Sequence, residues 1–289
     1  MSWEYRHLKR RLQLADDPLL LRFERFCEDA HAAMAGLEWS CKLAGEHWLP
    51  NRFYWLGRSP TPDLSGELAR LVDGLPFAPR GGLPRWTDTL ARHTASVLVG
   101  YAGAGAGRGA VLKLCLTLTR DAMPAEYRDA VGAWLPRAPA APPPGDATVV
   151  ISHLLAESGE CSPRLYVLYN EPSYRDPRVL DYMAPLIGDA GLQLARHHPR
   201  SGVTLRPDGT ALGIALRPSG LRDQPHPSHA LSPLRMPLLQ LAQRHPLVAE
   251  RLDRVCWVSL GLGHRGALLD SAALPAEMNL YIVLEDRGS

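Results

Sequence analysis

The chain has 289 residues, 46% of them hydrophobic and 21% charged, which is typical of a folded protein with a sizeable core. Its formal net charge of +2 argues against nucleic acid or an anionic membrane as a partner, and its five scattered cysteines argue against a disulfide framework or a zinc site. No apolar run is long enough to span a bilayer and the charged first 14 residues do not resemble a signal peptide, so we expect a cytoplasmic protein.

Helical and strand-like stretches alternate along the chain. Apolar residues at helical spacing predict helices, and each of these precedes two runs with the every-other-residue alternation of strands. Helices are expected over residues 18–34, 64–72, 125–134, 179–197 and 231–244. Strand pairs are expected over 37–43 and 51–56, 95–101 and 110–119, 148–156 and 163–169, 202–206 and 211–217, and 255–262 and 278–285. The pattern therefore indicates roughly five helix–hairpin units and ten antiparallel strands.

Turn-forming sequences separate several of these elements. A Gly-rich turn covers 103–109, a proline-rich loop covers 136–144, and Pro-Asp-Gly at 207–209 joins two strands. Antiparallel hairpins leave exposed hydrogen-bonding edges, which disappear when the sheet closes into a barrel. We expect a single α+β domain over 1–289, built as a ten-stranded antiparallel barrel ringed by helices. An open α+β sheet is the competing architecture, because periodicity alone does not separate the two.

Alternation within the strands distinguishes two faces. In the strand over 110–119, one face carries Leu112, Leu114, Leu116 and Leu118, and the other carries Lys113, Cys115, Thr117 and Thr119. In the strand over 37–43, Glu38, Ser40 and Lys42 alternate with Leu37, Trp39, Cys41 and Leu43. If the apolar face packs beneath the helices, the polar face looks into the barrel and predicts a functional cavity. The alternative is that the polar faces meet bulk solvent.

Basic and aromatic side chains recur on the predicted polar face. The basic residues are Lys42, Arg52, Lys113 and Arg217, and the aromatic residues are Tyr54, Tyr166, Trp257 and Tyr281. Converging basic groups bind a multiply charged anion such as a diphosphate, and aromatic faces stabilise a developing carbocation while excluding water. Taken singly, each basic residue fits a surface charge and each aromatic residue fits an ordinary cross-strand pair. No cluster of residues with metal-ligand spacing is present in the sequence.

The first predicted hairpin resembles a known family. The stretch LEWSCKL at 37–43, followed by NRF at 51–53, is similar to the cyanobactin-type peptide prenyltransferases, where Leu-Glu-x-Ser-Cys-Lys precedes Arg-Phe. Weaker similarities follow in the same order, at Leu112-Lys113, Leu165-Tyr166, Cys256-Trp257-Val258 and Leu280-Tyr281. The resemblance spans the chain from Phe23 to Leu284 and implies the ABBA fold, in which repeated α-β-β-α units close a ten-stranded antiparallel barrel around the active site.

The resemblance also implies roles for the charged residues. Glu38 would be the catalytic carboxylate, which orients the acceptor nucleophile and takes its proton. Lys42, Arg52 and Lys113 would hold the diphosphate of a prenyl donor, with Arg217 as a further candidate. Mg²⁺ would be the cofactor, bound mainly through the diphosphate rather than by protein ligands, and would help to neutralise the leaving group.

The same resemblance places the prenyl and acceptor pocket among aromatic residues and two glycines. The residues of this pocket would be Tyr54, Tyr166, Gly202, Gly213, Trp257 and Tyr281. Where relatives carry two tyrosines in the fourth hairpin, this chain has Gly213 and Ile214, and Gly202 stands where relatives that use dimethylallyl diphosphate have a bulky aromatic residue. Small residues there would lengthen the pocket and favour geranyl over dimethylallyl diphosphate. A barrel bend or bulge is the alternative reason for these glycines.

The resemblance therefore implies a prenyltransferase that moves an isoprenyl group, preferably geranyl, from its diphosphate onto a residue of a ribosomal, cyclic peptide. Two alternatives stay open: an ABBA enzyme that modifies a small phenol or indole, and a non-enzymatic barrel that binds a peptide or a hydrophobic ligand. Glu38 separates the enzymes from the last alternative, because a protein that only binds has no need of a buried carboxylate among basic groups.

Overall fold

The computed structural model describes residues 1–14, 16–44, 47–57, 62–73, 94–104, 109–118, 125, 143–156, 161–218, 234–262 and 277–286. The helix predicted over 125–134 lies outside these residues except for Ala125, and so does most of the proline-rich loop.

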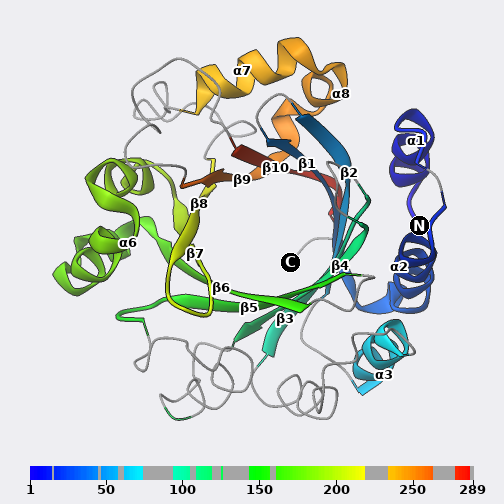
Figure 1. Cartoon of the computed structure of the whole chain (residues 1–289), viewed down its shortest axis with the longest axis horizontal. Coiled ribbons are helices and arrows are strands. Elements are labelled where there is room, and N and C mark those ends of the chain that lie inside the picture. The colour runs from blue at the N-terminus through cyan, green and yellow to red at the C-terminus, as the bar shows by residue number, and fades with distance from the viewer. Residues whose placement is uncertain are drawn as a thin grey trace.

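A closed antiparallel barrel forms the centre of the molecule (Figure 1). The order around the ring is β1-β10-β9-β8-β7-β6-β5-β4-β3-β2, so every strand is hydrogen-bonded on both sides. The strands are β1 (Met34–Ala44), β2 (His47–Gly57), β3 (Thr94–Ala102), β4 (Val111–Leu118), β5 (Thr148–Ala156), β6 (Cys161–Asn170), β7 (Arg200–Leu205), β8 (Ala211–Arg217), β9 (Val255–Gly261) and β10 (Glu277–Asp286). The predicted ten-stranded barrel is confirmed. The open sheet is wrong, because the first strand, β1, pairs with the last strand, β10, as well as with β2, and this pairing closes the ring.

Helices lie around the outside of the ring (Figure 1). The α-helices are α1 (Trp3–Arg11), α2 (Pro18–Asp29), α3 (Pro62–Val72), α6 (Pro177–Arg196), α7 (Arg235–Arg244) and α8 (Pro246–Ala249). Short 3₁₀ helices are η1 (His31–Ala33), η2 (Glu171–Arg175) and η4 (Leu252–Arg254). Within the described ranges, no helix has the length and apolar content needed to cross a bilayer.

The helices differ from the prediction in several details. The helix expected over 18–34 ends at Asp29, because η1 intervenes and β1 already begins at Met34. The helix expected over 179–197 is broken at Gly188, whose φ of 67° lies in the left-handed region that favours glycine. Helix α1 was not predicted at all, because its segment is strongly charged and only Tyr5 and Leu8 are buried.

The packing of the helices identifies the outer face of the barrel. Tyr5 of α1 contacts Phe53 with ring centroids 4.8 Å apart, and Phe26 of α2 contacts Trp55 at 5.0 Å. Since successive side chains of a strand point to opposite faces, Arg52 and Tyr54 point into the barrel. We call this barrel-facing side, defined by the same alternation in every strand, the inner face.

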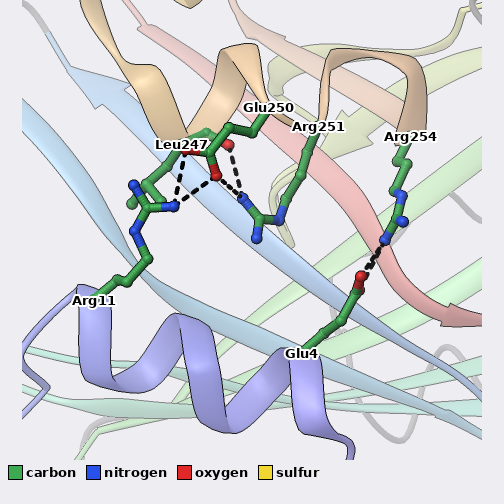
Figure 2. Close-up of polar contacts among 6 residues, drawn as sticks. All are labelled: Glu4, Arg11, Leu247, Glu250, Arg251 and Arg254. Carbon is green, nitrogen blue, oxygen red and sulfur yellow. Dashed lines mark hydrogen bonds and ion pairs between the residues drawn. The ribbon is translucent and has the colours of Figure 1, made fainter.

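Helix α1 is also attached to the segment that leads into β9 (Figure 2). Arg11 of α1 donates to the Glu250 carboxylate at 2.6 and 2.9 Å, and Arg254 of η4 donates to Glu4 at 2.6 Å. Arg251 donates to the same Glu250 carboxylate at 3.0 Å. The contacts of Arg11 and Arg254 join α1 to η4 and to the residue that follows α8, directly before β9 begins at Val255.

Candidate active site

The inner face of the closed barrel buries Glu38 and Lys113, so the alternative that the polar faces meet bulk solvent is wrong for these two residues. Glu38 and Lys113 are each only 8% exposed, although both are charged residues on strands. The strand register brings them together, because Glu38 is paired with Tyr54, Tyr54 with Gly100, and Gly100 with Lys113 across β1 to β4. A carboxylate and an ammonium group therefore share one row of the inner face, separated by a tyrosine and a glycine.

The Glu38 carboxyl group titrates close to neutrality. Burial raises its pKa from 4.5 to about 7, while a hydrogen bond from the Cys256 thiol and the positive charge of Lys113 act in the opposite direction. The thiol sulfur lies 3.3 Å from Glu38 Oε1. A group with a pKa near 7 can both accept and release a proton at physiological pH, which is the property required of a general base.

Aromatic rings surround the Lys113 ammonium group. Its Nζ lies 4.9 Å from the ring centroid of Tyr166 and 5.3 Å from that of Tyr54. The rings of Tyr54 and Tyr281 are 5.4 Å apart, so tyrosines from β2, β6 and β10 meet around the same point. Burial alone lowers the pKa of Lys113, but electrostatic interactions with Cys115 and these tyrosines outweigh it and hold the pKa well above its usual value. The inner face thus pairs a cation with electron-rich ring faces.

Of the other predicted basic residues, two contact side chains of β10 and one lies at the end of β8. Arg52 donates to Asn279 Oδ1 at 2.6 Å, and its guanidinium carbon is 6.0 Å from the Tyr54 ring centroid. Lys42 forms an ion pair with Glu277. Arg217 is the last residue of β8 and is exposed, and its link to the cluster is an electrostatic effect on Cys256. The structure therefore gathers Arg52 and Lys113 with Glu38, and leaves Lys42 and Arg217 nearer to solvent.

The remaining pocket residues, Trp257, Gly213 and Gly202, lie on β9, β8 and β7, which follow β10 around the ring. Trp257 is half-buried and is paired with Tyr281 in the register of β9 and β10. A Cβ atom at Gly202 would lie 2.0 Å from the carbonyl oxygen of Val167, and one at Gly213 would lie 2.6 Å from that of Leu260. Glycine is thus required at both positions for close approach of neighbouring strands. The geranyl preference based on these glycines stays a prediction.

Several residues of the cluster were not singled out from the sequence. Gly100 lies beneath Tyr54, since a Cβ atom there would be 2.4 Å from Tyr54 Cδ1 and Cε1. Asn279 accepts a hydrogen bond from Arg52, Glu277 forms an ion pair with Lys42, and Cys256 contacts Glu38. A glycine in the middle of an alternating strand was a usable signal for Gly100, whereas the other contacts depend on register between strands distant in sequence.

The side chains of the inner face determine how a metal ion could be bound there. Among the residues that the structure describes, no three His, Cys, Asp or Glu side chains are grouped for metal binding. Basic groups such as Arg52 and Lys113 line the inner face instead. Such a site fits Mg²⁺ when the ion is bound to an anionic ligand that contributes most of the coordinating oxygens.

A closed ten-stranded barrel with outer helices and a buried polar inner face places the chain in the ABBA fold class. No family model matches the chain, and no curated protein sequence matches it. Among solved structures, a 6-dimethylallyl tryptophan synthase matches with a TM-score of 0.53 and 14% sequence identity. The match covers 96% of this chain and 99% of that chain, so the two proteins share the whole barrel rather than one part of it.

Proposed function

We propose that the protein is a prenyltransferase, which moves an isoprenyl group from a diphosphate donor onto an acceptor bound inside the barrel. The observation that carries the proposal is the buried Glu38 carboxyl group, with its pKa of about 7, beside Lys113 and three tyrosine rings on one face. Burying a carboxylate costs free energy, and a barrel that only bound a ligand would gain nothing from that burial.

The proposed reaction begins with loss of the diphosphate. Lys113 and Arg52, with Lys42 after release from Glu277, bind the diphosphate and stabilise the charge that grows as the carbon–oxygen bond breaks with its electron pair. Mg²⁺ held through the diphosphate would add charge neutralisation at the leaving group. Arg217 at the end of β8 is a fourth candidate for the same anion.

The allylic carbon then bonds to the acceptor. The ring faces of Tyr54, Tyr166 and Tyr281 stabilise the positive charge on the isoprenyl group and exclude water from it, with Trp257 beside Tyr281. The acceptor nucleophile donates an electron pair to the allylic carbon, and Glu38 takes the proton that this nucleophile loses. The products are the prenylated acceptor, diphosphate and a protonated Glu38.

Two acceptor classes fit this chemistry. The resemblance of the first hairpin to cyanobactin-type enzymes supports a ribosomal, cyclic peptide with geranyl diphosphate as the preferred donor. The name of the 6-dimethylallyl tryptophan synthase supports an indole, and therefore a smaller acceptor and a shorter donor. The chemistry of Glu38 and Lys113 is the same in both cases.

The test is a transfer assay read by mass spectrometry. The protein is incubated with Mg²⁺, geranyl or dimethylallyl diphosphate, and either a panel of cyclic peptides or tryptophan and simple indoles. We expect the acceptor to gain one prenyl mass, and we expect Glu38→Gln to lose about 10²- to 10⁴-fold in rate, the usual contribution of a general base. Lys113→Met is expected to weaken donor binding.

Glu250→Gln is the matched control, because Glu250 is a carboxylate on the outer surface that contacts Arg11. Its transfer rate is expected to equal that of the wild type. Donor binding without a mass gain for any acceptor, with Glu38→Gln unchanged in binding, would favour the non-enzymatic barrel instead.

A further inference from the structure

Cys256 reaches the inner face only because β9 contains a β-bulge. Tyr281 of β10 is paired with Trp257, but the next residue, Ile282, is paired with Val255, so Cys256 is the extra residue. Regular alternation would turn Cys256 outward, away from the side on which Trp257 lies. The bulge instead directs Cys256 and Trp257 to the same side, while Val255 and Val258 stay buried.

The Cys256 thiol lies between two acceptors. Its sulfur is 3.3 Å from Glu38 Oε1 and 3.3 Å from the carbonyl oxygen of Tyr281. Burial, and then the Glu38 charge, raise the pKa of Cys256 well above its usual value, so the sulfur keeps its proton and acts as a donor. In the described part of the chain, this thiol is the hydrogen-bond donor that contacts the Glu38 carboxylate.

One thiol proton can satisfy only one of these acceptors at a time. When Glu38 is ionised, the carboxylate is the stronger acceptor, because hydrogen bonds to charged groups are stronger than those to neutral ones. When Glu38 carries a proton, the thiol can turn to the Tyr281 carbonyl oxygen. Both protonation states of Glu38 therefore leave the buried thiol with a partner.

We propose that Cys256 is a positioning residue for Glu38, whose thiol proton holds the carboxylate in the orientation that accepts a proton from the acceptor. This inference rests on the proposed function. Tyr54 of β2 is paired with Glu38, and the charge of Lys113 on β4 acts on its carboxyl group. Around these two, Arg52 of β2 and Tyr281 of β10 contact Tyr54, and Tyr166 of β6 contacts Lys113. Arg217 of β8 acts on Cys256. Among the described residues, the hydrogen bond to the Glu38 carboxylate comes from Cys256 of β9.

The first test measures Glu38 itself and does not depend on activity. The titration of the Glu38 carboxyl carbon is followed by ¹³C NMR in side-chain-labelled protein, and Glu38→Gln identifies its resonance. Cys256→Ala removes the donor, so we expect the titration midpoint to rise by about half to one pH unit, the effect of losing a hydrogen bond from a thiol, which is a weak donor. Cys256→Ser keeps a hydroxyl donor and is expected to stay near the wild-type midpoint.

The second test is the pH profile of transfer. A higher Glu38 midpoint moves the acid limb of kcat/KM in Cys256→Ala to higher pH by the same amount, which lowers the rate about 3- to 10-fold on that limb. The KM for the donor is expected to stay unchanged, because the thiol contacts Glu38 and not the diphosphate ligands. A purely structural role for Cys256 would change both parameters without moving the limb.

Two further variants keep the tests decisive. Cys256→Val fills more of the thiol space without a donor, and should behave as Cys256→Ala does even if the alanine variant folds poorly. Cys27→Ala, a buried cysteine of α2 in the outer layer, should leave the Glu38 midpoint and the pH profile unchanged. An unchanged midpoint in both donor-free variants, or an equal shift in Cys256→Ser, would overturn the inference. A shifted midpoint in a protein without transfer activity would instead refute the proposed function.

Discussion

The outer and inner faces of the barrel use neighbouring residues of the same strands for different purposes. Trp39 points outward and is fully buried in the layer between the barrel and the helices, while Glu38, one residue earlier, points inward and is 8% exposed. Both are buried, but only the outer residue is buried at a gain in hydrophobic free energy. Burial of Glu38 raises the free energy of its charged form.

Residues of the outer face therefore contribute mainly to stability, and residues of the inner face mainly to the proposed chemistry. The outer face is a continuous apolar layer, whose members include Phe53 and Trp55 beneath α1 and α2. The inner face contains Tyr54 and Lys113, which lie outside that apolar cluster. Substitutions on the two faces should therefore affect different measurements, and four predictions test this separation.

The largest expected effect is on the outer face. Trp39→Ala removes a large, fully buried side chain, so we expect the free energy of unfolding to fall by about 3–5 kcal/mol. Glu38→Gln, its neighbour on the inner face, is expected to leave the protein as stable at pH 7.5 or more stable, because a neutral amide is cheaper to bury. Denaturant unfolding of both variants measures the contrast, and similar losses of stability would contradict it.

The second prediction concerns pH. The pKa of Glu38 is about 7 in the folded protein and near 4.5 when unfolded, so the folded state holds this proton more tightly. The stabilising contribution is complete below about pH 4.5 and is lost as pH rises through 7, by up to about 3 kcal/mol in total. Glu38→Gln lacks this contribution.

The difference in unfolding free energy between Glu38→Gln and the wild type should therefore grow between pH 4.5 and 7.5. Paired denaturant curves across this range measure it. Because other titrating groups, such as His153, are present in both proteins, the difference isolates Glu38. Parallel pH profiles for the two proteins would show that Glu38 is not buried as described.

The third prediction concerns the support beneath Tyr54. A Cβ atom in Gly100→Ala would lie 2.4 Å from two atoms of the Tyr54 ring, so the ring must leave its present position beside Lys113. We expect a loss of about 1–3 kcal/mol in stability, as for other overpacked sites, together with weaker donor binding. Gly66→Ala in α3 is the control, since nothing lies within 4 Å of its Cβ position. Equal stability of the two variants would contradict this account.

The smallest effect is expected at the surface contact between α1 and α8. Arg11 and Glu250 are 38% and 44% exposed, so their ion pair should contribute less than about 1 kcal/mol. A double-mutant cycle with Arg11→Ala and Glu250→Ala measures the coupling, which should shrink as salt is added. A coupling that salt does not change would mean that the pair is less exposed than the structure indicates.

Much of the barrel could be predicted because alternation is a local property of sequence. The strand over 148–156 has its predicted limits, and the inward orientation of Glu38 and Lys113 followed from the apolar residues beside them. Helix α1 was missed because its charged residues obscure the two side chains, Tyr5 and Leu8, that attach it to the core.

Contacts between distant strands could not be predicted in the same way. The ion pair of Lys42 with Glu277 depends on the register of β1 and β10, which are separated by most of the chain. The bulge that turns Cys256 inward depends on the register of β9 and β10. A shift of one residue in the register of a strand moves each of its side chains to the opposite face of the sheet. The alternation within one sequence does not specify which residues of two strands are paired. Alternation therefore predicted the inward orientation of Glu38 and Lys113, but not their contacts with distant strands.

Pairing of β1 with β10 has a consequence for synthesis of the protein. Glu38 is made early, whereas its neighbours Cys256 and Tyr281 emerge from the ribosome only after most of the chain has been translated. Until then β1 has one exposed edge, and contacts of such large sequence separation form slowly. A nascent chain therefore carries the Glu38 carboxylate before the Cys256 thiol that contacts it has been made. The complete site forms only when the first strand of the ring pairs with the last.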